Sequence, residues 1–410
     1  MVSRLVLGLA VALFTVACTT EADTVDGSTT TAVSVPETTT TTDPPDFGSV
    51  DAGRLAIIDF RGDIVVVSPD GSDRTAITTN AGEAAYTQPI WSPDSTQIAF
   101  GEVTEDGFGV RIEKLDGGDP TTIAMPNQAF YMYWAPDGEN MGVLHNGARG
   151  LDFEMVDVSE GASRVLDQGS PFYFSWSPDS ERVAIHEGAD RFETLDTDGE
   201  REELGDTAPN YLVPQWLPQG ILHVVDDQLV VEDGSGDRTA LAEVSDQTMF
   251  VANSQGDLVA VQSLGEGGSR SVALDEVGRV ELNAVSVVDI GTGDIEVVDS
   301  SPAIGFWWSP DGESLLILSP ASDGESVTAR VWSADGSLTD YSTYRPSPIQ
   351  LRELFPFFPQ YAQSMTFWAP DSSGFALAGE LDGEAGIWIQ ALEATDPRLI
   401  AQGLWVAWSG

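Results

Sequence analysis

The sequence predicts an all-β fold, a β-propeller built of four-stranded antiparallel blades. Three observations predict it: a Trp-x-Pro-Asp segment that recurs at intervals of 36 to 60 residues, short apolar strands on either side of each copy, and a Gly/Asp-rich turn that follows. One propeller blade occupies about 40–45 residues, close to most of these intervals. We expect eight blades, with seven as the alternative, in a single domain over residues 48–410.

The repeated segment has the chemistry of a type I turn. Ser or Ala stands at the first turn position in most copies, Pro fixes φ at the second, and Gly or Ser occupies the fourth. A divergent copy lies at residues 252–256, and the last copy is cut short at the C-terminus. The other copies lie at residues 91–95, 134–138, 176–180, 216–220, 308–312 and 368–372.

Each repeat supplies four strands, which we call A to D in chain order. Strand A ends at the tryptophan, strand B follows the turn, and a Gly/Asp-rich turn joins C to D, as at residues 69–72 and 334–337. Such turns are typical of β-hairpins. The tryptophan is expected to pack between neighbouring blades.

The two ends of the repeat region are expected to complete one blade together. Residues 54–59 form a B strand with no A strand before it, and residues 403–408 form an A strand with no B, C or D strand after it. Pairing these two segments closes the ring and removes the exposed sheet edges that an open fan of blades would have.

This pattern resembles the TolB-type propeller, a WD40-like repeat with the signature Trp-Ser-Pro-Asp-Gly, a strand and an Asp-Gly hairpin. The resemblance covers roughly residues 50–410 and implies the propeller fold. Members of this family make periplasmic protein–protein contacts or gate peptidases, and many are lipoproteins. The chain lacks TolB's separate N-terminal domain and has more blades, so the resemblance implies no role in the Tol system.

The N-terminus predicts export and lipidation. Residues 1–17 are typical of a signal peptide, because the apolar run 5–17 reaches only about 20 Å as a helix, too short to span a bilayer. Residues 15–18 resemble the bacterial lipobox, which implies that Cys18 is acylated. Residues 18–47 are rich in Thr, Ser and Pro and are expected to form a disordered tether. The predicted location is the extracytoplasmic side of a bacterial cell membrane.

The charge of the chain excludes some partners. The formal net charge is -48, so the protein repels the phosphates of nucleic acids and the surfaces of anionic lipids. The acidic residues are scattered, which favours a solvated acidic coat over a dedicated cation site. Cys18 is the single cysteine, which excludes an intramolecular disulfide and a cysteine zinc site.

No catalytic motif is recognisable in the sequence. There is no Gly-x-Ser-x-Gly, and the lone Lys114 excludes a phosphate-binding loop with its lysine. His145, His186 and His223 fall at or near the ends of B strands in three successive blades. Three imidazoles could bind a metal, but blades diverge with radius, so we expect separate histidines, no metal and no cofactor.

Two long insertions stand out, at residues 263–282 and 344–363. Both interrupt B–C or D–A connections, which share one face of a propeller, whereas the tight A–B and C–D turns share the other. Long loops in compact folds are often functional, and aromatic residues and Arg are typical of interface hot spots. The predicted binding residues are Tyr344, Arg345, Arg352, Phe355, Phe357, Phe358 and Tyr361. The alternative is that this loop plugs the wide channel of the ring.

Two functions remain open from the sequence. The first is a non-catalytic scaffold that binds a protein, peptide or glycan on the B–C/D–A face. The second is a propeller enzyme of the glycan hydrolase or lyase type with carboxylates in the central channel. Paired carboxylates about 5–10 Å apart in the channel would favour the enzyme, and a plugged channel would favour the scaffold.

Overall fold

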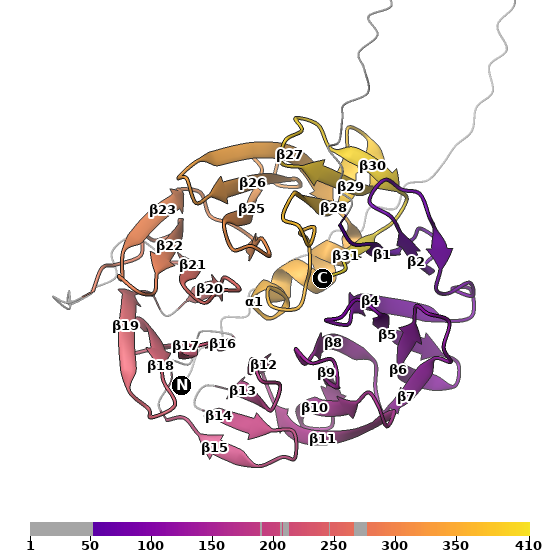
Figure 1. The fold of residues 1–410 in the computed structure, drawn as a ribbon, viewed down its shortest axis with the longest axis horizontal. Helices are drawn as coiled ribbons and strands as arrows, with labels where there is room; N and C mark the ends of the chain where they lie inside the picture. The colour runs from indigo at the N-terminus through magenta and orange to yellow at the C-terminus, as the bar shows by residue number, and fades with distance from the viewer. Residues whose placement is uncertain (1–51, 189–190, 206, 208–212, 246, 266–276) are drawn as a thin grey trace, which may run out of the picture. The chain divides into compact units, whose positions relative to one another are not determined.

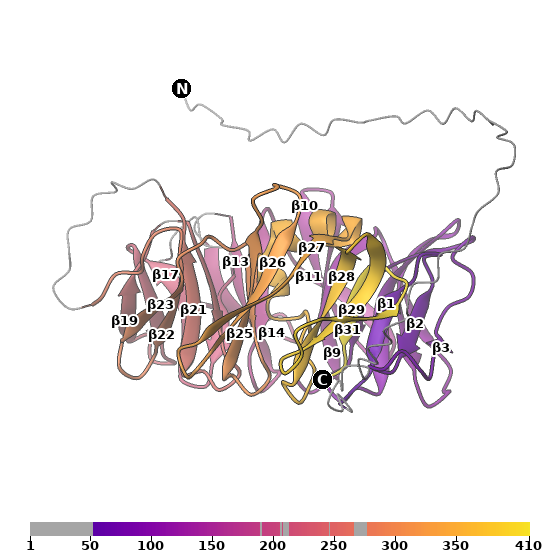
Figure 2. The ribbon, with the colours of Figure 1, turned by 90° about the horizontal axis from the view of Figure 1, so that it is seen from above.

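The computed structural model describes residues 52–188, 191–205, 207, 213–245, 247–265 and 277–410. Their strands form antiparallel sheets arranged around a central channel, with strand A of each blade innermost and strand D outermost (Figure 1). Seen from the edge of the ring, the strands run between its two faces (Figure 2). Among these residues, no helix is long and apolar enough to cross a membrane.

Blades one to four each contain four strands, ordered from the channel outwards. They are β31 (Trp405–Trp408), β1 (Leu55–Ile58), β2 (Ile64–Val67) and β3 (Thr75–Ala76); β4 (Ala85–Trp91), β5 (Gln97–Thr104), β6 (Gly107–Lys114) and β7 (Thr121–Met125); β8 (Ala129–Trp134), β9 (Asn140–Gly147), β10 (Gly150–Asp157) and β11 (Ala162–Gly169); and β12 (Phe172–Trp176), β13 (Arg182–Glu187), β14 (Arg191–Asp196) and β15 (Arg201–Glu203).

The remaining blades follow the same order. They are β16 (Gln215–Leu217), β17 (Gly220–Val225), β18 (Gln228–Glu232) and β19 (Arg238–Glu243); β20 (Thr248–Ala252), β21 (Leu258–Ser263), β22 (Val285–Asp289) and β23 (Ile295–Asp299); β24 (Gly305–Trp308), β25 (Ser314–Pro320), β26 (Val327–Ser333) and β27 (Leu338–Pro346); and β28 (Gly374–Leu381), β29 (Glu384–Ala391) and β30 (Arg398–Ala401).

The strand order fits the predicted count of eight blades. The divergent repeat around Asn253 is a genuine A–B turn, since the N–H of Asn253 donates to the carbonyl of Leu258 at 2.9 Å. Blades seven and eight are joined in one seven-stranded sheet, where β27 continues into a two-residue pairing with β28. The inner strand of blade eight is reduced to a bridge between Trp368 and Phe375.

Ring closure follows the sequence prediction. β31 pairs antiparallel with β1, with Leu55 opposite Trp408 and Ile58 opposite Trp405. Both tryptophans are buried, with exposed fractions of 1% for Trp405 and 0% for Trp408. One blade therefore takes its strands from the two ends of the described chain.

The repeat tryptophans connect neighbouring blades, as the sequence predicted. In four blades the indole N–H donates to a backbone carbonyl on the inner strand of the preceding blade. These bonds run from Trp91 to Ala407 (3.0 Å), Trp176 to Tyr133 (3.1 Å), Trp308 to Val251 (2.8 Å) and Trp368 to Trp307 (3.0 Å). The first of them links blade two to the strand that closes the ring.

The turns after the tryptophans explain the Ser, Pro, Asp and Gly of the repeat. Ser92 Oγ donates to Asp94 Oδ1 at 2.6 Å, and this bond lowers the pKa of Asp94. The fourth turn position adopts positive φ, 75° at Gly138 and 58° at Ser95, a conformation that Gly adopts without strain. Each copy is therefore a self-contained turn that sets the register of strands A and B.

We predict that ring closure stabilises the whole propeller. Deleting residues 403–410 removes β31 with two buried tryptophans and leaves the edge of β1 unpaired. The free energy of unfolding should fall by more than about 3 kcal/mol, the usual cost of truncating one buried aromatic, in a single transition followed by circular dichroism. The control Phe60→Ala, an exposed side chain in the same blade, should melt as wild type. A deletion variant with unchanged melting would show that closure contributes nothing.

Candidate functional site

The insertion after β27 forms three consecutive helical turns. A π-helical turn, η1 (Gln350–Leu354), runs into a 3₁₀ turn, η2 (Phe355–Phe357), and then into α1 (Phe358–Tyr361). The chain continues through Pro356 without leaving the helical conformation. Pro356 is the second residue of the 3₁₀ turn, near its start, where a missing N–H costs no hydrogen bond.

One side of this insertion fills the channel, where Figure 1 places α1. The ring of Phe358 packs edge-on against Phe306 and Trp307 of blade seven, with centroids 4.9 and 5.0 Å away. Tyr361 packs edge-on against Tyr131 of blade three at 5.0 Å. The insertion therefore bridges opposite parts of the ring, as the plug alternative predicted.

Hydrogen bonds fix the same side to the inner strands. Gln360 Nε2 donates to the carbonyl of Phe174 at 2.8 Å, and the N–H of Phe174 donates back to Gln360 Oε1 at 3.2 Å. The hydroxyl of Tyr361 donates to the carbonyl of Phe130 at 2.7 Å. The insertion thus supplies partners for backbone groups on the channel edges of β8 and β12.

The seven residues predicted to bind a partner divide into two groups. Tyr344, Phe358 and Tyr361 are buried, so they belong to the core rather than to a contact surface. Phe355 is half-buried, and Phe357 is 54% exposed. Arg345 and Arg352 are exposed, and Arg345 pairs with Glu325. The predicted contact surface therefore retains Arg345, Arg352, Phe355 and Phe357.

A cavity of about 510 Å³ opens between the insertion and blades two to four; we call it the channel cavity. Its walls come from the first residues of β4, β8 and β12, the end of β9, the start of β10 and residues 352–361. These are D–A and B–C ends of strands, so the cavity lies on the face that the sequence predicted for binding. Three of the predicted residues line it: Arg352, Phe357 and Tyr361.

The channel cavity combines aromatic rings with a balanced pair of charges. Phe130, Tyr173 and Phe357 contribute aromatic surface. Among the described residues that line it, Glu353 is the one carboxylate and Arg352 the one guanidinium, with Arg352 Nη2 3.8 Å from Glu353 Oε1. Burial raises the pKa of Glu353. The walls therefore carry little net charge, in contrast to the chain as a whole.

A strained residue helps to build this cavity. Gln88 has φ of 48° at a bulge in β4, a conformation that costs energy for any residue other than Gly. Its amide donates to the hydroxyl of Tyr361 and to the carbonyl of Phe130. The neighbouring Thr87 Oγ1 is buried in the cavity wall without a hydrogen-bond partner among the described contacts. The bulge turns polar groups of blade two toward the insertion.

A second cavity of about 580 Å³, which we call the junction cavity, lies between blades three and four. Its wall includes Arg149 from the B–C loop, Gln168 near the end of β11, Ser170 from the D–A connection, and Glu187 at the end of β13. It lies on the same face as the channel cavity. Consecutive residues line the two cavities: Ser170 lines the junction cavity and Pro171 lines the channel cavity.

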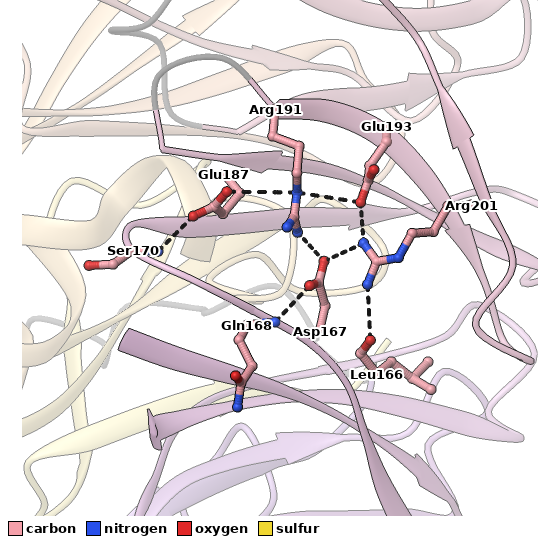
Figure 3. A network of polar contacts seen from close by, with 8 residues as sticks. All are labelled: Leu166, Asp167, Gln168, Ser170, Glu187, Arg191, Glu193 and Arg201. Atoms are coloured by element: carbon pink, nitrogen blue, oxygen red, sulfur yellow. Dashed lines mark hydrogen bonds and ion pairs between the residues drawn. The ribbon is translucent and has the colours of Figure 1, made fainter. Parts of the chain in front are cut away.

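An ion-pair network supports the junction cavity (Figure 3). Asp167, whose side chain is 6% exposed, pairs with Arg191 and with Arg201, the latter at 2.9 Å. Glu193 lies beside the same two guanidinium groups, and Glu187 accepts the N–H of Ser170 at 3.2 Å. These bonds tie the outer strand of blade three to blade four and fix the D–A loop.

The three histidines do not converge on a metal site. His145 Nε2 lies 2.8 Å from Glu154 Oε2, and His223 Nε2 lies 3.1 Å from Glu232 Oε2, each within its own blade. Burial lowers the pKa of His223 to about 3, so its imidazole is neutral near pH 7. In the part of the chain that the structure describes, no three His, Cys, Asp or Glu side chains could hold a metal ion together.

Sequence reasoning missed Gln88, Tyr173 and Gln360 as site residues. For Gln88 a signal existed, since a polar residue followed by Pro89 interrupts an otherwise apolar strand, a pattern that favours a bulge. For Gln360 none existed, because its partner Phe174 lies 186 residues away. Cys18 and residues 266–276 of the first insertion lie outside the described residues.

Three comparisons place the chain beside known proteins. No family model matches the chain, and no curated protein matches it. Solved structures that resemble it include TolB from Acinetobacter baumannii, 15% identical with a TM-score of 0.42, covering 71% of this chain and 63% of that one. An oligogalacturonate lyase from Vibrio parahaemolyticus is 13% identical, with a TM-score of 0.49, covering 83% of this chain and 98% of that one. The WD40 domain of Sif2 is 13% identical, with a TM-score of 0.43, covering 76% and 84%. At these identities the likeness says nothing of the activity of this chain.

Proposed function

We propose that this protein is a non-catalytic scaffold, held on the extracytoplasmic side of a bacterial membrane by a lipid on Cys18, that binds its partner on the face of the ring carrying the channel cavity. The observation that carries the proposal is the insertion itself. Its buried side occupies the channel, and its exposed side, with Arg352 and Phe357, lines an open cavity.

The same geometry gives less support to an enzyme. A glycan hydrolase needs two carboxyl groups across the scissile bond. The described wall of the channel cavity holds one, Glu353, paired with Arg352. Filling of the channel by Phe358 and Tyr361 also occupies the place where the sequence left room for a carboxylate pair.

The anchor rests on the sequence of residues 1–47. A lipid on Cys18 with a Thr- and Pro-rich tether would hold the propeller near the membrane while leaving its faces accessible. We expect Cys18→Ala to move the protein from the membrane pellet to the soluble fraction, measured by fractionation and immunoblotting. The neighbouring substitution Thr20→Ala should leave it in the pellet. Retention of the Cys18→Ala protein in the membrane would contradict lipid anchoring.

The binding face is tested with two matched variants. Phe357→Ala removes the exposed aromatic ring at the cavity, whereas Leu338→Ala removes an exposed apolar side chain, 40% exposed, beside a C–D turn on the opposite face. We expect Phe357→Ala to abolish cross-linked capture of the partner from cell envelopes, because such anchors carry most interface energy. Leu338→Ala should capture as wild type, and both should melt normally. Equal capture by all three proteins would refute this assignment of the face.

A further inference from the structure

We infer that the ligand of this face is a neutral oligosaccharide that extends from the channel cavity into the junction cavity. The inference rests on the proposed function and specifies its ligand. Both cavities lie on the same face, and neither volume, about 510 and 580 Å³, exceeds the range of roughly 300–1,000 Å³ typical of ligand sites.

Charge points to a neutral ligand. The chain carries a formal net charge of -48, yet the channel cavity holds one guanidinium, Arg352, against one carboxylate, Glu353. The junction cavity is lined by Arg149, Asp167 and Glu187. Beside it, Arg191 and Arg201 pair with Asp167 and Glu193. Counted together, the lining and this network hold as many arginines as carboxylates. A basic peptide would find more complementary charge almost anywhere else on the protein.

The walls have the chemistry that recognises sugar rings. Phe130, Tyr173 and Phe357 offer aromatic surface on which the C–H faces of a pyranose can stack. The exposed amides of Gln128 and Asn146 line the same cavity, and the described contacts give neither side chain a partner. A carboxamide donates and accepts hydrogen bonds, as a sugar hydroxyl does. The orphaned Thr87 Oγ1 adds a buried polar atom in the same wall.

The walls of the two cavities are continuous, which points to an oligosaccharide rather than a monosaccharide. Arg149 lines the junction cavity, and Leu151, two residues further along the chain, lines the channel cavity. Likewise, Ser170 lines the junction cavity and the next residue, Pro171, lines the channel cavity. Arg149 Nη2 donates to Gln168 Oε1 at 2.9 Å, and Glu187 fixes the N–H of Ser170 at 3.2 Å. The outer part of the site is therefore polar and held in place before a ligand arrives.

The test is calorimetric titration of the purified propeller with cellohexaose, chitohexaose, maltohexaose and mannohexaose, their disaccharides, and hexagalacturonate as an acidic contrast. We expect one neutral hexasaccharide to bind, and its disaccharide to bind at least about tenfold more weakly, a difference of one decade in Kd. Tyr173→Ala should abolish binding of both lengths, Tyr173→Phe should preserve it, and Gln168→Ala should weaken only the hexasaccharide.

Two titration results would overturn the inference by themselves. One is the absence of binding by every neutral hexasaccharide, and the other is tighter binding of hexagalacturonate. If either occurs while Phe357→Ala still abolishes capture of a protein from envelopes, the binding face stands and its ligand is a protein. If Phe357→Ala changes neither sugar binding nor capture, both the inference and the proposed function fall.

Discussion

The rest of the structure depends on one constraint, that the inner edge of every blade must find hydrogen-bond partners. Strand A pairs with strand B on one side only, so its other side presents backbone groups to the channel. The repeat tryptophans of neighbouring blades supply some of these partners; the indole N–H of Trp91, for example, donates to the carbonyl of Ala407. Glutamine side chains supply others. The amide of Gln215 donates to the carbonyl of Phe250 and accepts the N–H of Ala252. The ring is thus held together by side chains that complete its inner strands.

At the centre of the ring, the insertion supplies further hydrogen-bond partners for the inner strands. Gln360 and Tyr361 reach β12 and β8 from within the channel, while Phe358 packs on blade seven. Because this side is fixed, the other side presents Arg352 and Phe357 at one face. The sequence left plug and binding surface as alternatives. The structure shows the plug on one side of the segment, and the binding surface that we propose lies on its other side. The channel cavity is the space between the segment and blades two to four.

The sequence was most informative where structure is local or repeated. Turn chemistry, blade order and closure by residues 403–408 follow from motifs that recur along the chain, and the pairing of Leu55 with Trp408 confirms the closure. The site was less accessible, because it is assembled by contacts between distant residues, such as Gln360 with Phe174. An aromatic segment alone does not reveal which rings are buried, so Phe358 and Phe357 looked equivalent although one is core and the other surface. Lipidation of Cys18 stays a prediction.

The central claim is that the buried side of the insertion stabilises the ring by contacting its inner strands, whereas the exposed side contributes little to stability. Thermal and chemical unfolding of Gln360→Ala and of Gln128→Ala tests it most directly, because the first glutamine is buried against β12 and the second is exposed at the cavity. Losing the Gln360 amide leaves two backbone groups of Phe174 without partners, so unfolding free energy should fall by about 2–4 kcal/mol, whereas Gln128→Ala should change it by less than about 0.5 kcal/mol. Equal stability of the two variants would contradict the account.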